Sequence, residues 1–157
     1  MDIRKRNSKN QESKVAKEIS GKVTPASGAL WGAKADVRSD IFLVECKTTN
    51  RGYYSLTYDT WHKIYTEAVK DGLRIPVMCI DLNNGKYRYA VLCSNDLGDN
   101  VDVPVLDTET DSKKPSSFRI KGVCRKIVYH KSKPFFFDLT IVEWNTFLDD
   151  ILPEYTQ

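Results

Sequence analysis

Several features that define common protein classes are missing from this 157-residue sequence. No apolar run approaches the roughly 20 residues that a membrane-spanning helix needs, and the first ten residues, MDIRKRNSKN, are too polar for a signal peptide. The four cysteines form no CxxC pair and have no histidine at zinc-ligand spacing, so we expect reduced, packed thiols. These absences favour a soluble, cytoplasmic protein with no membrane partner.

Motifs of nucleotide-binding and serine-hydrolase sites are missing too. The chain contains neither a GxGxxG nor a GxxxxGKS phosphate loop, and it has no GxSxG nucleophile turn. We therefore expect no small-molecule cofactor. The 41% of hydrophobic residues and 11% of aromatic residues suit one compact domain over residues 1–157.

Charges are sorted into blocks along the chain, although the net charge is only +3. Residues 94–112 form an acidic segment without Lys or Arg, and residues 113–133 form a basic segment without Asp or Glu. A second basic group runs from Arg4 to Lys22. Basic clusters fit contact with a polyanion, because neutralised phosphates release counterions. In the basic segment we single out Lys121, Arg125 and Lys126 as candidate DNA contacts; the alternative is a solvated face.

The N-terminal pattern predicts a short amphipathic helix followed by a loop. Ser8 and Gln11 form a capping box, and the apolar stripe after them ends at Gly21. Glu12 lies on or beside that stripe, so its carboxylate needs a partner. The next stretch, GKVTPASGALWG, is typical of a loop that leads into a pair of strands.

The segment IFLVECK predicts a central strand, since both of its faces carry apolar residues. Alternation places Glu45 and Lys47 on the same face. A second helix, capped by Thr57 and with Tyr65 and Val69 on its buried stripe, leads to another buried strand, IPVMCIDL. Strand, helix and strand in this order predict a parallel crossover.

Residues 83–157 are less assignable. We expect a turn at 83–85, a strand KYRYAVLC, a loop over the acidic segment 94–112, and one long strand FRIKGVCRKIVYH in the basic segment 113–133. A turn, a strand FFFDLTIV and a closing helix from Glu143 to Ile151 complete the chain. The fold class is α/β, with a mixed sheet flanked by helices and a C-terminal β-hairpin and helix extension.

One charged constellation stands out in the predicted hairpin. Asp36 precedes Glu45 by nine residues, and with a turn around Ser39 to Phe42 the two carboxylates are opposite or diagonal neighbours, roughly 5 to 8 Å apart at Cβ. Such a pair repels itself unless a cation lies between, and hard oxygen ligands suit Mg²⁺ or Mn²⁺. Lys47 is then placed to orient water and offset phosphate charge, with Glu12 joining from the helix. The alternative is a turn residue, Asp36, beside an ordinary exposed Glu45 and Lys47 pair.

These residues resemble the motif of the PD-(D/E)XK nucleases, with Ala35-Asp36 in place of Pro-Asp and Glu45-Cys46-Lys47 as the second half. From Gln11 to Leu82 the chain is similar to archaeal-type Holliday junction resolvases and their phage relatives, which have a Glu on the first helix and a Ser-Gly loop before the motif. The resemblance implies a restriction-endonuclease-like fold, with residues 1–82 as a resolvase-like catalytic core.

The resemblance also implies roles for individual residues and a substrate. Catalysis would involve Glu12, Asp36, Glu45 and Lys47; metal ligands would be Asp36, Glu45, the Cys46 carbonyl and Glu12; Ser27 would approach the DNA. Family members are Mg²⁺-dependent homodimers that cut four-way DNA junctions. From the sequence itself, Lys34, Arg38 and Arg51 are further candidate phosphate contacts. Alternatives are a nuclease for another DNA substrate in restriction, repair or fork processing, and a non-catalytic nucleic-acid-binding module.

Overall fold

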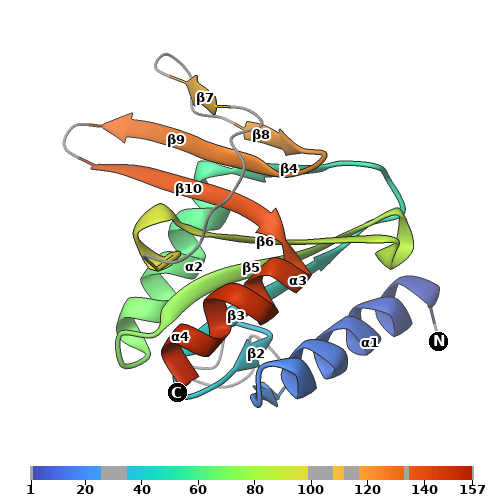
Figure 1. Ribbon diagram of the computed structural model, residues 1–157. Helices are drawn as coiled ribbons and strands as arrows, with labels where there is room; N and C mark the ends of the chain where they lie inside the picture. Colours follow the sequence, from blue (N-terminus) through green and yellow to red (C-terminus); the bar gives the residue numbers. More distant parts are fainter. Residues whose placement is uncertain (1, 26–34, 99–107, 112–116, 133–134, 157) are drawn as a thin grey trace.

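The computed structural model describes residues 2–25, 35–98, 108–111, 117–132 and 135–156 (Figure 1). Within residues 108–117 and 124–136 it describes the backbone of the strands and no side chains. Ser27 and Lys34, two of the predicted DNA contacts, lie outside the described residues.

Most of the strands belong to one mixed sheet. Its order is β1-β2-β3-β5-β6-β10-β9-β7, and β4 pairs with β8 in a small second sheet. The strands are β1 (Lys22–Val23), β2 (Val37–Arg38), β3 (Phe42–Thr48), β4 (Tyr54–Thr57), β5 (Ile75–Leu82), β6 (Tyr87–Cys93), β7 (Thr108–Asp111), β8 (Ser117–Ile120), β9 (Cys124–Ser132) and β10 (Phe135–Glu143).

In sequence order, one helix precedes the strands of the sheet, one connects two of them, and the others follow the last strand. The helices are α1 (Ile3–Glu18), α2 (Tyr58–Lys70), α3 (Trp144–Thr146) and α4 (Leu152–Thr156), with a wider π-helical turn (Phe147–Ile151) that joins the last two, and short 3₁₀ turns at Asn83–Gly85 and Ser94–Asp96. Strands β3 and β5 are parallel and α2 connects them, which confirms the predicted crossover. The α/β class with a mixed sheet flanked by helices is therefore confirmed.

Two apolar cores lie on opposite faces of the sheet (Figure 1). On one face α1 and the C-terminal helices pack on the side chains of Phe42, Val44 and Cys46. On the other face α2 and the β4–β8 pair cover Met78 and Ile80. Leu43 also lies on this second face, where it packs with α2. Because side chains alternate along β3, Glu45 and Lys47 lie on the same face as Leu43.

The first helix begins earlier than the sequence pattern indicates. Its N-cap is Asp2, whose side chain accepts a hydrogen bond from the backbone N–H of Arg4, so the prediction of a cap at Ser8 is wrong. Ser8 lies inside the helix and its hydroxyl donates to Glu12 over 3.2 Å. The first two turns contain only one apolar residue, the exposed Ile3, so no apolar period marks them.

Other differences concern segments whose position depends on distant partners. The predicted long strand is interrupted between Ile120 and Cys124, because β8 leaves the main sheet to pair with β4, a strand that we did not predict. The acidic segment contains β7, which pairs with β9. The closing helical segment extends to Thr156.

On α2, the Thr57 cap is confirmed, since its hydroxyl accepts from the Thr60 N–H. Tyr65 and Val69, which we placed on the buried stripe, are 39% and 43% exposed. None of the described helices has the length and apolar character needed to span a membrane.

Candidate active site

The register of β2 and β3 brings two carboxylates together. Val37 lies opposite Val44 and Arg38 opposite Leu43, and the backbone N–H of Asp36 donates to the Val44 carbonyl at 3.1 Å, so Asp36 lies next to Val44 at the start of β2. The negative charge of Asp36 contributes to the raised pKa of Glu45, so the two carboxylates lie near each other. Strand β2 does not continue past this point, and beyond it the edge of β3 has no neighbouring strand among the described residues.

The Asp36 side chain takes the place of that missing strand. Its Oδ2 accepts a hydrogen bond of 2.8 Å from the backbone N–H of Cys46. In a strand the N–H and the C=O of one residue point to the same edge. The carbonyl of Cys46 therefore faces the open edge as well, beside the Asp36 carboxylate.

Lys47 completes the group on this face of β3. Its Nζ lies 3.1 Å from Oε1 of Glu45. Burial lowers the pKa of Lys47, but the negative charge and the hydrogen bond of Glu45 outweigh burial and the net shift is upward. Lys47 is thus held as a cation beside the two acids.

Both acids titrate above their ordinary range. Burial, followed by the negative charge of Asp36, raises the pKa of Glu45 from 4.5 to about 7, although Lys47 acts in the opposite direction. Burial also raises the pKa of Asp36, against the Cys46 N–H and the charge of Lys47. Carboxyl groups with such raised pKa values mark a place where a further positive charge would be stabilising.

Glu12 reaches the same place from α1. Glu12 and Asp36 line one hollow. Burial and then the charge of Asp36 raise the pKa of Glu12, while the hydrogen bond from Ser8 lowers it. A third carboxylate thus faces the open edge from the opposite layer of the fold.

A buried glutamine fixes α1 against the strand that carries the site. Gln11 is only 3% exposed, and its Nε2 donates to the carbonyl of Lys47 at 2.9 Å and to that of Cys79 at 3.1 Å. The contact ties α1 to β3 and β5 one residue before Glu12. We missed this role in the sequence; the signal was a polar residue one turn before Val15, on the apolar stripe of α1.

Helix α2 adds two charges that the sequence pattern did not reveal. Ala68 packs with Ala35 and Leu43, which holds α2 against the hairpin. From this helix Lys63 lowers the pKa of Asp36 and Glu67 raises that of Glu45. These influences depend on the crossover and leave no local pattern in the sequence.

The oxygen donors at the open edge suit a hard divalent cation. They are the carboxylates of Asp36, Glu45 and Glu12 and the carbonyl of Cys46, and Mg²⁺ and Mn²⁺ prefer such oxygen ligands. In the described part of the chain, no group of three or more His, Cys, Asp or Glu side chains is arranged tightly enough to hold a metal. A cation would therefore depend on a backbone or substrate oxygen in addition to the side chains.

The other predicted DNA contacts are spread over the molecule. Nε of Arg38 pairs with Asp71 at 2.9 Å, and Arg51 donates to the Tyr53 hydroxyl at 3.3 Å. Lys121 is exposed just after β8. Arg125 and Lys126 belong to β9, and their side chains lie outside the described part. The sheet order separates β9 from β3 by four strand spacings, about 19 Å.

Comparison of the chain with models of known families, with curated proteins and with solved structures finds no match.

Proposed function

We propose that this protein is a metal-dependent DNA endonuclease with a restriction-endonuclease-like fold. The observation that supports this most strongly is the gathering of Asp36, Glu45 and Lys47 near one open strand edge, with the ammonium group 3.1 Å from a carboxylate. Phosphodiester hydrolysis needs a cation near the phosphate and a group that orients water, and this edge carries candidates for both.

The proposed ligands are Asp36, Glu45, the Cys46 carbonyl and Glu12. A bound Mg²⁺ or Mn²⁺ ion would polarise the phosphate and lower the pKa of a nearby water molecule. Lys47 would contact that water or a phosphate oxygen, because its Nζ is already fixed by Glu45. The hydrogen bond from Cys46 would keep the Asp36 carboxylate in place throughout the reaction.

An ordinary surface ion pair explains these residues less well. The Glu45 side chain is only 17% exposed, and its pKa is raised to about 7 by burial and by Asp36. Exposed pairs are screened by water and contribute little. A buried, mutually repelling pair destabilises the metal-free fold, which is understandable if the site serves chemistry.

Four-way DNA junctions are the proposed substrate, and a cytoplasmic homodimer is the proposed form. Both follow from the resemblance to Holliday junction resolvases, and a two-fold enzyme suits a two-fold junction. The competing functions are a nuclease of the same core acting on plain duplex, and a binding module without catalysis.

The test is a cleavage assay on labelled four-way junction, linear duplex and single strand, each in Mg²⁺ and in EDTA. Wild type is compared with Glu45→Ala and with Asp149→Ala, a control that removes an exposed carboxylate of the C-terminal helical segment. We expect junction cleavage in Mg²⁺ by wild type and by the control, and a loss of at least about 100-fold in Glu45→Ala, since the residue holds the metal.

The outcomes separate the candidate functions. Equal cleavage of duplex and junction would favour a nuclease with another DNA substrate. Binding without cleavage in either Mg²⁺ or Mn²⁺ would favour the binding module and contradict the proposed activity.

A further inference from the structure

Three adjoining hollows follow α1 across the candidate active site. The first, of about 750 Å³, has Arg4, Ser8, Lys47 and Arg51 in its wall. The second, of about 510 Å³, is lined by Ser8, Glu12 and Asp36 among others. The third, of about 410 Å³, lies between the β1–β2 pair and the end of α2. Ser8 is common to the first two hollows, and Val23 and Thr24 are common to the last two.

Basic residues are in excess in the two end hollows, whereas the middle hollow holds equal numbers of acidic and basic residues. Arg4, Lys47 and Arg51 outnumber Asp2 in the first hollow. The second holds Glu12 and Asp36 opposite Lys5 and Lys9. In the third, Lys22, Arg38 and Arg74 outnumber Asp40 and Asp71. The proposed metal ligands Glu12 and Asp36 thus lie in the middle of the row, and arginines lie at both of its ends.

Two arginines of the third hollow are held in place by one aspartate. Arg74 donates from Nε to the Ser39 carbonyl at 2.7 Å and contacts Asp71 at 3.2 Å, and Arg38 contacts the same carboxylate at 2.9 Å. One carboxylate between two guanidinium groups leaves a positive excess. No described residue accepts a hydrogen bond from the terminal nitrogens of Arg38, whose side chain is 48% exposed.

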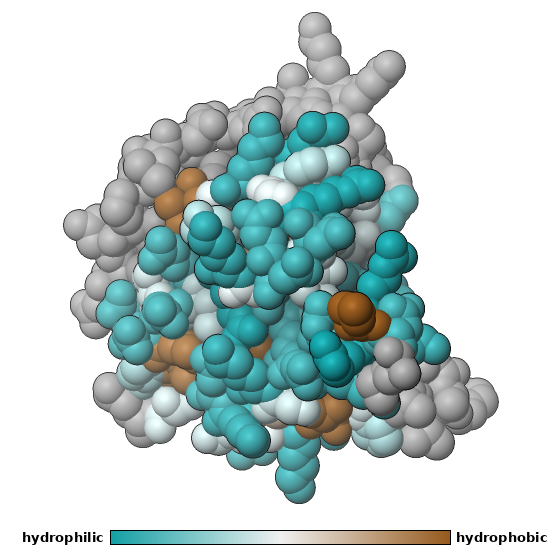
Figure 2. All heavy atoms as spheres, turned by 90° about the vertical axis from the view of Figure 1, so that its right-hand side faces the viewer, coloured by the Kyte–Doolittle hydropathy of each residue, from teal (hydrophilic) through white to brown (hydrophobic). Residues whose placement is uncertain are grey.

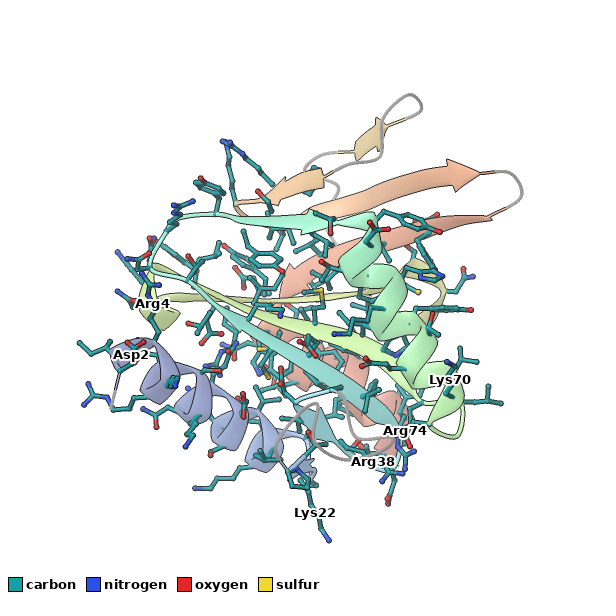
Figure 3. The ribbon with its side chains drawn as sticks, turned by 180° about the vertical axis from the view of Figure 1, so that it is seen from behind. Asp2, Arg4, Lys22, Arg38, Lys70 and Arg74 are labelled. Carbon is teal, nitrogen blue, oxygen red and sulfur yellow. The ribbon has the colours of Figure 1, made fainter. Side chains whose placement is uncertain are left out.

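Figure 3 shows the two ends of the row. Arg4 lies at the N-terminal end of α1, whereas Lys22, Arg38 and Arg74 lie beyond its C-terminal end. The face that includes the N-terminal half of α1 is largely hydrophilic, with only isolated apolar spots (Figure 2). Such a face does not suit an apolar protein partner, since the cores of protein interfaces are depleted of charge.

The length of the row fits a short stretch of nucleic-acid backbone. Helix α1 has 16 residues, which corresponds to about 24 Å. One DNA strand carries a phosphate about every 3.4 Å along its axis, so about seven phosphates would lie beside the helix. Basic groups at both ends would hold the flanking phosphates, and such interactions fix the register of a protein on DNA.

We propose that the three hollows form one groove that takes a DNA strand along α1, with the phosphate to be cut beside Glu12 and Asp36 in the middle and flanking phosphates on Arg4 and Arg51 at one end and on Lys22 and Arg38 at the other. This inference rests on the proposed nuclease function for its middle part. It gives the strand a path along α1, which carries most of the second basic group, whereas the DNA contacts that we singled out from the charge blocks lie in the basic segment 113–133.

The test is binding of a fluorescein-labelled four-way junction in EDTA, followed as a function of salt concentration. A groove variant, Arg4→Gln/Lys9→Gln/Lys22→Gln, is compared with a control variant, Lys14→Gln/Lys17→Gln/Lys86→Gln. Both remove three exposed cations, and the control residues line none of the three hollows. Circular dichroism and thermal unfolding establish that both are folded.

We expect the groove variant to bind at least about tenfold more weakly at about 0.1 M salt, with a salt slope lower by about 0.9 for each phosphate that the variant no longer neutralises. The control variant should retain most of the affinity and slope. Equal losses of affinity in the two variants, or an unchanged groove variant, would overturn the proposal. Should a triple variant fail to fold, Arg4→Gln and Lys17→Gln on the same helix give the same comparison on a smaller scale.

Failure of the groove and failure of the nuclease function can be told apart. If the groove variant loses binding while no metal supports cleavage by wild type, the groove stands and the nuclease function fails. If wild type cuts DNA in a Glu45-dependent way and the groove variant binds and cuts equally well, the nuclease function stands and the groove is wrong.

Discussion

Glu45 is held in a position that disfavours its charged form. Its pKa is raised to about 7 by burial and by Asp36, and only Lys47 compensates nearby. Groups placed in this way reduce the stability of the fold unless something binds to them. Substitutions of Glu45 should therefore change the stability of the protein in a way that shows whether the site binds a cation.

Replacing Glu45 by Gln should stabilise the metal-free protein at high pH. Because folding raises the pKa of Glu45 to about 7, its favourable contribution is fully present below about pH 4.5 and is lost as the pH rises through 7. At pH 8 we expect Glu45→Gln to be more stable than wild type by about 3 kcal/mol at most, since one pKa unit corresponds to about 1.4 kcal/mol and the pKa of about 7 already includes the attraction of Lys47.

Urea unfolding in EDTA at pH 4 and pH 8 measures this effect. The difference between variant and wild type should nearly vanish at pH 4, and Asp149→Asn should resemble wild type at both values. A variant that is no more stable than wild type at pH 8 would contradict the raised pKa.

With a divalent cation bound, wild type should become more stable than Glu45→Gln, the reverse of the order expected without metal. An ion that binds only the folded state stabilises it by about 2.7 kcal/mol at about 100 times its Kd. We expect Mn²⁺ or Mg²⁺ to raise the Tm of wild type and of Asp149→Asn, but not that of Glu45→Gln or Asp36→Asn. Equal shifts in all four proteins would place the cation elsewhere.

Among the secondary-structure elements, α1 depends on the clamp made by Gln11. Its amide donates to two carbonyls, on β3 and β5, in a buried position. Gln11→Leu leaves both acceptors without this donor, and we expect a loss of about 1–3 kcal/mol in the free energy of unfolding. Ser13→Ala, an exposed change on the same helix, should cost much less. Chemical denaturation compares the two; similar losses of stability would show that the clamp is unimportant.

Strands β5 and β6 share a buried ion pair that also reaches α1. Asp81 is 4% exposed and receives two hydrogen bonds from Arg88, at 2.6 and 2.8 Å, while Arg88 also contacts Glu18 at 3.2 Å. We expect Arg88→Met to cost about 3–5 kcal/mol, because it leaves the Asp81 charge buried alone. Arg88→Met/Asp81→Leu should regain part of that stability in thermal unfolding. A double variant no more stable than the single one would contradict this account.

Elements with a strong local signal were predictable from the sequence. Apolar runs mark β3 and β5, and the Thr57 cap marks α2. Strand β8 was not predictable, because its place is set by pairing of Ile120 with Tyr54 on a strand more than 60 residues earlier. The start of α1 was missed because its first turns carry no apolar period.

Only the part of the candidate site that is formed by residues close together in the sequence was predictable. Alternation places Glu45 and Lys47 on one face, and the hairpin brings Asp36 near them, without further information. The clamp by Gln11 and the charges of Lys63 and Glu67 come from helices in two different layers. Such interactions are fixed by tertiary packing, which no local spacing encodes.

At the scale of the whole molecule, the basic segment is separated from the candidate site. Strand β9 lies about 19 Å from β3 across the sheet. Charge removal at Lys121, Arg125 and Lys126 should therefore weaken binding of a four-way junction, which is wide, more than binding of a short duplex. The same change should flatten the salt dependence of binding. Fluorescence anisotropy with both probes measures this; an unchanged slope for the junction would remove the segment from the binding surface.

The shortness of β2 has a consequence for the solution behaviour of the protein. An uncovered strand edge invites another chain to add to it, and proteins commonly prevent this with charged side chains. Here the Asp36 carboxylate already engages the N–H of Cys46, and Glu45 and Lys47 lie beside it. The same charges thus guard the sheet against self-association, so variants that neutralise all three should aggregate more readily even where their fold is intact.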